Sequence, residues 1–253
     1  MPALTAVFLS KVRFGSLALM ACLQCLPAHA IQPYKADYVF NIDNKFNGQS
    51  SRVLTQNRQG WLYTFSAKVP VLASATETSQ FVLTPDQNVL SMNHTLNYKI
   101  LVKTKKSSMV FHPTSHLVNV QHNGKASRYA GRVDALDDLN LEIQVREDLK
   151  RGKLKTEYWL ADEKDIEPVR FINEGKVKVT TPAGTFDAYA IRRVHKRPTL
   201  TSTFWLAPAL DYLPVKVVQK DDGTIYEFSL TKYQPMPAIS VGAQSPTSTN
   251  TAR

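Results

Sequence analysis

Residues 176–194 read KVKVTTPAGTFDAYAIRRV, and residues 199–230 read TLTSTFWLAPALDYLPVKVVQKDDGTIYEFSL. Apolar and polar residues alternate in short runs through both stretches, and strong turn signals separate the runs. Proline and glycine stand where a tight turn needs them in Thr181-Pro182-Ala183-Gly184, and Asp222-Gly223 is a pair favoured in two-residue hairpins. The pattern predicts a series of antiparallel hairpins.

The chain before this region repeats the same pattern from Tyr34 onward. Runs such as YKADYVFNI, WLYTFSAKV and HLVNVQ recur about every ten to fourteen residues, and Asn47-Gly48 and Asn123-Gly124 are further hairpin signals. Helices do not alternate with these runs, which excludes a doubly wound α/β fold. We therefore predict a mainly β fold: one large curved antiparallel sheet, an open or half barrel, with one short helix covering it.

The predicted helix lies within residues 133–152, VDALDDLNLEIQVREDLKRG. Asp134 is a suitable N-cap, acidic residues follow it, and Lys150 and Arg151 precede Gly152, as a helix C-terminus favours. Leu139 to Val145 also alternate strictly, so a strand over residues 134–151 is the alternative. The capping pattern favours the helix.

Residues 1–30 have the features of a secretory signal peptide. Basic residues precede an uncharged apolar run at 14–26, and Ala28-His29-Ala30 has small residues at the two positions that a signal peptidase reads. We expect cleavage after Ala30 and export to the periplasm. A lipoprotein anchored at Cys22, within Leu19-Met20-Ala21-Cys22, is the alternative.

Both cysteines of the chain, Cys22 and Cys25, lie in this segment. The mature chain would then have no disulfide, no thiolate catalysis and no cysteine metal site. Removal of Lys11 and Arg13 would leave 29 basic against 21 acidic side chains, a net charge of +8. Such an excess favours solubility, and it also suits contact with anionic envelope lipids.

The mature chain is expected to form a single β domain over residues 31–233. Residues 234–253 are rich in proline, serine and threonine and contain few large apolar residues. Such a segment buries too little surface to offset its ordering entropy, so we predict a disordered tail.

The TPAGTFDAY turn, the FWLAP strand end and the DYLPVKV run resemble the domain of unknown function family 3108. The opening YKADYVF and the DALDDLNLEI segment fit the same family. The resemblance implies a curved antiparallel sheet in an exported bacterial protein, similar in outline to open-barrel lipoprotein carriers. It implies no activity and no catalytic residues.

A curved sheet with an apolar concave face is suited to hold an acyl chain. Aromatic residues are plentiful for this purpose, although the same residues would fill an ordinary core. The candidate ligand-facing residues are Trp61, Phe65, Phe81, Trp159, Phe204 and Trp205.

Two basic runs, at residues 103–106 and 192–197, are candidates for contact with anionic headgroups. Alternation places Lys103 with Lys105 on one face, and Arg193 with Arg197 on one face. Charges of this kind also protect sheet edges from aggregation. Peripheral membrane contact is consistent with these runs, whereas nucleic acid is a poor partner for an exported protein.

Local catalytic motifs are absent from the sequence, which contains no GxSxG, HExxH or Walker signature. His112, His116 and His122 are close in sequence but have no fixed geometry, so we expect no metal and no cofactor. The leading hypothesis is non-catalytic binding or transport of an apolar or amphipathic envelope molecule such as a lipid. The alternatives are an assembly partner of another envelope protein, and an enzyme without a local signature.

Overall fold

The computed structural model describes residues 31–238. The predicted signal peptide, its cleavage site and Cys22 lie outside the described residues, as do residues 239–253 of the predicted tail. The described part contains fifteen strands, one α-helix and one short 3-10 helix. No helix within it is long and apolar enough to cross a bilayer.

The first half of the chain forms eight strands in succession. They are β1 (Tyr34–Ile42), β2 (Phe46–Asn57), β3 (Gly60–Val69), β4 (Ala73–Leu83), β5 (Val89–Ile100), β6 (Lys103–His112), β7 (Leu117–His122) and β8 (Lys125–Ala130). The second half contains β9 (Ala135–Leu136), α1 (Asp138–Lys150), β10 (Tyr158–Ala161), β11 (Ile166–Thr181), β12 (Gly184–Val194), β13 (Leu200–Ala207), η1 (Pro208–Leu210), β14 (Leu213–Asp221) and β15 (Thr224–Pro235).

All fifteen strands belong to one sheet, in the order β8-β7-β6-β5-β4-β3-β2-β1-β15-β14-β13-β12-β11-β10-β9. The sheet does not close into a barrel, because β8 and β9 stand at opposite ends of this order. The predicted fold, a large curved sheet with one covering helix, is confirmed. It is mixed rather than wholly antiparallel, since β9 and β10 run parallel. Helix α1 is the crossover that such a parallel pair requires.

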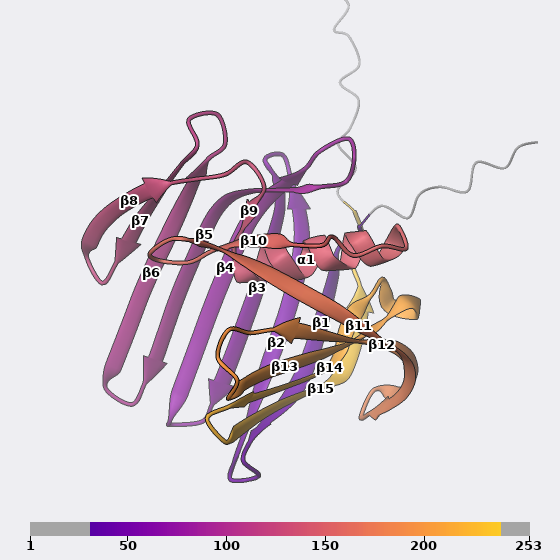
Figure 1. Cartoon of the computed structure of the whole chain (residues 1–253). Helices are drawn as coiled ribbons and strands as arrows, with labels where there is room; N and C mark the ends of the chain where they lie inside the picture. The colour runs from indigo at the N-terminus through magenta and orange to yellow at the C-terminus, as the bar shows by residue number, and fades with distance from the viewer. Residues whose placement is uncertain (1–30, 239–253) are drawn as a thin grey trace, which may run out of the picture. The chain divides into compact units, whose positions relative to one another are not determined.

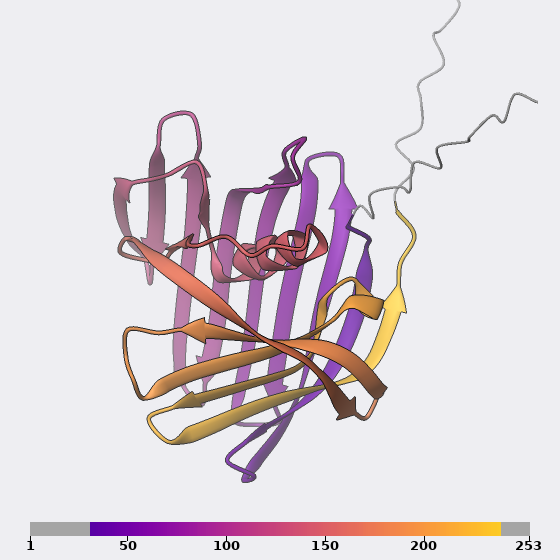
Figure 2. The same ribbon diagram turned by 45° about the vertical axis from the view of Figure 1, so that its right-hand side comes forward.

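Strands β1 and β15 join the two halves at the centre of the sheet. Tyr34 lies opposite Pro235 and Ile42 opposite Tyr226, with a bulge at Asp37/Tyr38. Strand β15 therefore includes Gln234 and Pro235, which were predicted to belong to the tail. The second half crosses over one face of β1–β6, and α1 lies on this same side (Figures 1 and 2). We call the faces of both halves that pack toward α1 the inner face, and the opposite one the outer face.

Helix α1 begins three residues later than predicted. Its N-cap is Asp137, whose side chain accepts a hydrogen bond from the backbone N–H of Asn140 at 3.0 Å. Asp134 cannot serve as the cap because residues 135–136 are extended and pair with β10. At the other end, Gly152 adopts φ +81° and donates to the carbonyl of Leu149 at 3.0 Å, which closes the helix as predicted.

Burial of α1 on all sides explains its ambiguous sequence pattern. Its apolar residues Leu139, Leu141, Ile143 and Val145 are all buried, and so are polar residues between them. A helix enclosed by two halves of a sheet needs apolar residues around most of its circumference. The resulting alternation imitates a strand.

Two of the predicted hairpin dipeptides are turns and one is not. Asn123-Gly124 and Asp222-Gly223 have the positive φ values that tight hairpins require. Asn47-Gly48 instead lies inside β2, where Gly48 sits beneath the ring of Phe40. A Cβ at residue 48 would overlap that ring, so the glycine permits close approach rather than a turn.

Candidate functional site

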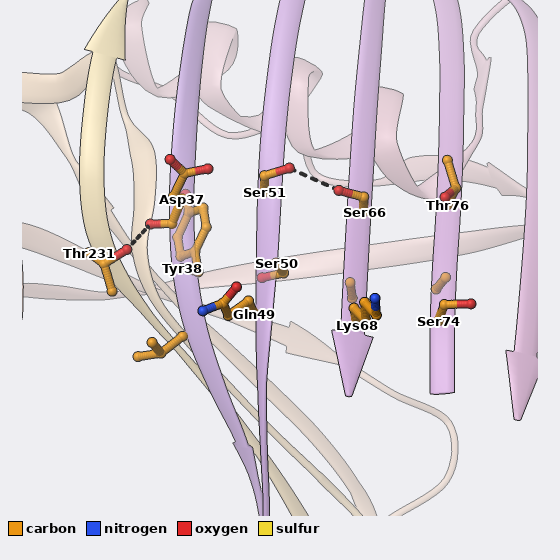
Figure 3. A pocket seen from close by; sticks show the side chains of 13 residues that line it. Asp37, Tyr38, Gln49, Ser50, Ser51, Ser66, Lys68, Ser74, Thr76 and Thr231 are labelled. Atoms are coloured by element: carbon orange, nitrogen blue, oxygen red, sulfur yellow. Dashed lines mark hydrogen bonds between the residues drawn. The ribbon is translucent and has the colours of Figure 1, made fainter. Parts of the chain in front are cut away.

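A spacious hollow lies on the outer face, across β15, β1, β2, β3 and β4 (Figure 3). Its volume is about 650 Å³, and Asp37, Ser51, Ser66 and Thr76 form one cross-strand row in it. The hydroxyls of Ser51 and Ser66 are 2.8 Å apart and bond to each other. The aromatic residue nearby, Tyr38, donates its hydroxyl to the Pro214 carbonyl and is buried. This hollow is polar and contains none of the predicted site residues.

A second, smaller cavity lies on the inner face between α1 and strands β11–β13. It has a volume of about 60 Å³ and is mainly apolar. Its lining residues are Asp138, Leu141, Glu142, Val145, Phe171, Ile191, Arg193, Phe204 and Leu206. We call this cavity the crevice. It contains two predicted site residues of different kinds, the apolar Phe204 and the basic Arg193.

Arg193 also lines a third hollow, which we call the basic hollow. This hollow has a volume of about 170 Å³ and lies over the ends of β11 and β12. Its polar lining includes His195, Lys196, Arg197 and Glu167. Arg193 therefore connects an apolar space with a charged one. Arg197, another predicted headgroup contact, lies in the same hollow and is paired with Asp221 and Asp222, while Lys196 is paired with Glu167.

The guanidinium group of Arg193 is only partly satisfied. Its Nη1 donates to Oδ1 of Asp138 at 3.1 Å, but its Nε is buried and has no hydrogen-bond partner within residues 31–238. Only 17% of the Arg193 side chain is exposed, against 64% of Asp138. A buried donor without an acceptor is costly, and an anionic ligand atom would satisfy it.

The electrostatic environment of His195 is consistent with an anion site. Burial, together with the positive charges of Arg193 and Arg197, lowers the pKa of this imidazole below its ordinary value. Its Nε2 lies 3.0 Å from the hydroxyl of Ser202. Burial is the main cause of this lowered pKa and the two cations add to it, so a bound anion would offset the part that comes from the cations.

Charged side chains hold α1 firmly to the first half of the sheet. Glu142 forms an ion pair with Arg52 and accepts from the hydroxyl of Tyr63 at 2.6 Å. Arg146 donates to the hydroxyl of Tyr34 at 2.7 Å. Burial raises the pKa of both tyrosines, so their hydroxyls remain protonated donors and acceptors.

The contacts between α1 and β11–β13 are mainly apolar rather than charged. Leu141 and Val145 face Phe171, Ile191 and Leu206 there, and the Arg193–Asp138 pair stands at the edge. Aromatic rings continue away from this interface, with Phe171 in edge-to-face contact with Phe204 at 6.5 Å and with Tyr158 at 5.5 Å. The crevice thus lies beside an apolar part of the helix surface, whereas Arg146 and Lys150, further along the helix, form ion pairs with Asp211 of the second half.

The remaining predicted apolar residues occupy separate places. Trp61 and Phe81 are buried core residues that stack on each other, and Phe65 lies beneath the guanidinium of Arg52 at 5.2 Å. Trp159 and Trp205 are half-buried, and Trp205 also packs against the main apolar core. Each follows an inner-face residue, Tyr158 or Phe204, and consecutive strand residues point to opposite faces.

The outer-face tryptophans are instead covered by cations. Arg132 lies 3.9 Å from the ring centroid of Trp159, and Lys216 lies 5.9 Å from that of Trp205. Lys103 and Lys105 are on β6, at the far side of the sheet order from Arg193 on β12. Lys105 forms an ion pair with Glu163 at 2.9 Å. The two predicted basic runs therefore do not form one site.

Sequence reasoning missed most of the crevice residues. Ile191 and Leu206 looked like ordinary strand residues, Phe171 was one of many aromatic residues that could line a cavity, and Asp138 looked like one of several solvated helix acids. The i,i+4 spacing of Leu141 and Val145 was the available signal, since it puts both on one side of a helix. It did not show which strands that side would meet.

The described residues include one buried acidic group with a strongly shifted pKa. Burial raises the pKa of Asp137 to about 6, although His94 and the bond from Ser79 act in the opposite direction. Its carboxylate already accepts from Ser79 and from Asn140, as a helix cap does. Within residues 31–238, no group of three or more histidine or acidic residues is placed to hold a metal ion.

Comparisons with known proteins place the chain in a family. A similar crystal structure is that of a β-barrel-like protein of domain of unknown function DUF1849 from Brucella abortus, with a TM-score of 0.56 and 10% identity over 81% of this chain and 98% of that chain. A candidate lipoprotein from Parabacteroides distasonis has a TM-score of 0.31, at 10% identity over 81% of this chain and 96% of that one, which is too low to indicate a shared fold. No curated protein matches significantly. The family model of DUF3108, a protein family of unknown function, matches residues 33–231. The chain belongs to the DUF3108 family.

Proposed function

We propose that this protein binds, without catalysis, an amphipathic molecule that has an alkyl chain and an anionic headgroup. The alkyl chain would enter the crevice, and the headgroup would occupy the basic hollow. The observation that carries the proposal is the position of Arg193, which lines both spaces and has a buried Nε without a partner. A guanidinium group between an apolar cavity and a basic one suits a ligand that carries both an alkyl chain and an anionic headgroup.

The crevice must widen to take such a chain. Its volume of about 60 Å³ corresponds to about two liquid water molecules. Widening beside Leu141 and Val145 breaks mainly apolar contacts and the Arg193–Asp138 pair, provided that the ion pairs of Arg146 and Lys150 with Asp211 stay intact. Separation of α1 from β1–β3 would instead break the buried Arg52–Glu142 pair, which is far more costly. We therefore propose that β11–β13 move and that α1 stays on the first half.

The proposed setting is the bacterial cell envelope. Support comes from the sequence of residues 1–30, which has the features of a secretory signal, and from the basic balance of the remaining chain. Support for a role without catalysis is the character of the site itself, where the polar groups lie at the edge of an apolar space and the hydroxyl that contacts His195, that of Ser202, is buried.

Ligand binding should be tested first on protein purified from its native envelope extract. Native mass spectrometry with organic extraction should show an adduct that extracts as an amphiphile. A clean apo mass, with no rise in melting temperature across a panel of single-chain anionic amphiphiles, would contradict the proposal. That result would direct attention to partner pull-downs and the assembly hypothesis.

Strand alternation supplies matched controls for the site. Arg193→Gln should lower the affinity for an anionic alkyl probe about tenfold, because a charged hydrogen bond is lost. Arg192→Gln, on the opposite face and paired with Glu174, should leave it unchanged. In the same way, Phe204→Ala should weaken binding of the alkyl chain, while Trp205→Ala should not. Equal effects within either pair would place the ligand elsewhere.

A further inference from the structure

Two neighbouring hairpin turns at one end of the sheet are unusually apolar. They connect β3 with β4 and β5 with β6, and both lie at the lower end of the first half in Figure 1. Val71 is 97% exposed, Val102 92% and Leu101 59%, the highest values for large apolar residues in the described part. A hydrogen bond of 2.8 Å from Leu101 N–H to the Leu72 carbonyl joins the two turns. We call Val71, Leu72, Ile100, Leu101 and Val102 the apolar tip.

The backbone at the apolar tip is unfavourable for the residues that it contains. Val71 adopts φ +66° and Leu101 φ +51°, in the left-handed region where glycine and asparagine are preferred. The other non-glycine residues with positive φ in residues 31–238 are Asp43, Asn44, Gln87, His116, Asn123, Asp211, Tyr212 and Asp222. Aliphatic residues at such positions cost stability, and Val71, which is 97% exposed, gains almost no apolar burial in return. A requirement other than folding explains them.

The turns at the opposite end of the same strands provide an internal comparison. The β2–β3 turn contains Arg58 and Gln59, the β4–β5 turn contains residues 84–88, TPDQN, and the β6–β7 turn contains residues 113–116, PTSH. None of these three turns has a large apolar residue. The apolar character is therefore confined to one end of the first half.

Lysines surround the apolar tip. Residues 68–76 and 97–106, which form the two turns and the strand ends next to them, contain five lysines and no acidic residue. The cross-strand register puts Lys68, Ser74 and Lys99 in one row, so lysines stand on both sides of the β3–β4 turn. Lys105 is paired with Glu163, whereas Lys68, Lys99, Lys103 and Lys106 are exposed.

We infer that the apolar tip inserts into the interface of an anionic lipid bilayer, with the lysines on the headgroups. Aliphatic side chains that extend beyond a ring of cations match the two layers of such a membrane surface. The charge complementarity distinguishes this occupant from a neutral apolar protein surface. The inference is independent of the crevice, because the two sites share no residue.

Sedimentation with vesicles tests the inference on the full chain. We expect binding to vesicles of phosphatidylglycerol and phosphatidylcholine, weaker binding to phosphatidylcholine alone, and a decrease with added salt. Val71→Ser/Val102→Ser and Lys99→Glu/Lys103→Glu should each reduce binding about tenfold or more. The matched controls are Ile172→Ser/Val177→Ser, which changes exposed apolar residues of β11, and Arg58→Glu/Lys153→Glu.

A depth measurement separates insertion from simple electrostatic adsorption. Tryptophan at residue 102 (Val102→Trp) should be quenched by brominated lipids, whereas Ser115→Trp in the opposite turn should not. Equal vesicle binding by tip and control variants would overturn the inference, because another segment would then hold the membrane. Loss of self-association in the tip variants, with vesicle binding unchanged, would overturn it in favour of an interface between copies.

Discussion

Arg193 of β12 donates a 3.1 Å hydrogen bond to Asp138, the first residue of α1. This bond joins strand β12 to the helix, and it engages only one of the three guanidinium nitrogens. The Nε of the same side chain remains buried and without a partner in the described residues. Asp138 thus competes with an anionic ligand for Arg193.

Removal of this competitor should improve binding. Asp138→Asn is expected to raise the affinity for an anionic amphiphile severalfold, because Arg193 is released. Stability should change by less than about 1 kcal/mol, since Asp138 is largely exposed. Titration calorimetry and urea unfolding measure the two effects. A fall in affinity would show that Asp138 helps to hold the ligand.

The buried pair between Arg52 and Glu142 should respond very differently to mutation. Glu142→Gln would leave the Arg52 charge buried, with 11% of its side chain exposed, and we expect a loss of about 3 kcal/mol in the free energy of unfolding. Glu174→Gln removes the half-exposed partner of Arg192 and should cost less than about 1 kcal/mol. If urea unfolding showed similar losses of stability for the two variants, the Arg52–Glu142 pair would not be what holds α1 to the first half of the sheet.

The raised pKa of Asp137 predicts a pH-dependent stability. Because its folded-state pKa of about 6 lies above the ordinary value of 3.8, the folded protein binds more protons between these values than the unfolded chain does. The free energy of unfolding contributed by Asp137 should therefore fall by about 2 kcal/mol as pH rises from about 4 to about 6.

Asp137→Asn isolates this contribution. Asparagine also caps helices, and its amide group would have the unpartnered Oδ1 of Asn140 as an acceptor. As pH rises from about 4 to about 6, the natural protein should lose stability relative to the Asp137→Asn variant. A constant difference in urea unfolding at pH 4, 5 and 6 would show that Asp137 titrates normally.

His195 should report ligand binding directly. Burial and the charges of Arg193 and Arg197 lower its pKa, and a bound anionic headgroup would neutralise part of that charge. Its pKa, followed by NMR, should therefore rise on addition of an anionic amphiphile. His112, outside the basic hollow and close to Asn119, serves as the control. An unchanged His195 in the presence of bound ligand would place the headgroup elsewhere.

Val71→Asn should affect stability and membrane binding in opposite directions. Asparagine tolerates the left-handed conformation at φ +66°, so the variant should be more stable by about 1 kcal/mol. Its vesicle binding should nevertheless decrease, because an apolar side chain is lost. A thermal melt and a vesicle sedimentation series on the same sample measure both. A decrease in stability would mean that Val71 has a folding role.

Local patterns determined the sheet. Alternation and turn signals depend on residues close in sequence, and they correctly indicated a long series of hairpins and a capped helix between Asp138 and Lys150. Where a local signal was misleading, a distant contact was the reason. Asn47-Gly48 is not a turn because Phe40 needs the space above Gly48.

Only the tertiary structure decided which face of each strand is the inner one. Alternation separates Phe204 from Trp205 but does not say which of them meets α1. The acidic residues Glu147 and Asp148 of α1 looked solvated in sequence and are buried, because the two halves of the sheet enclose the helix. Arg193 joins the crevice to the basic hollow, and the Val71 turn lies beside the Leu101 turn, through contacts between separate segments. Such contacts depend on how the whole sheet curves, and no short stretch of sequence encodes that curvature.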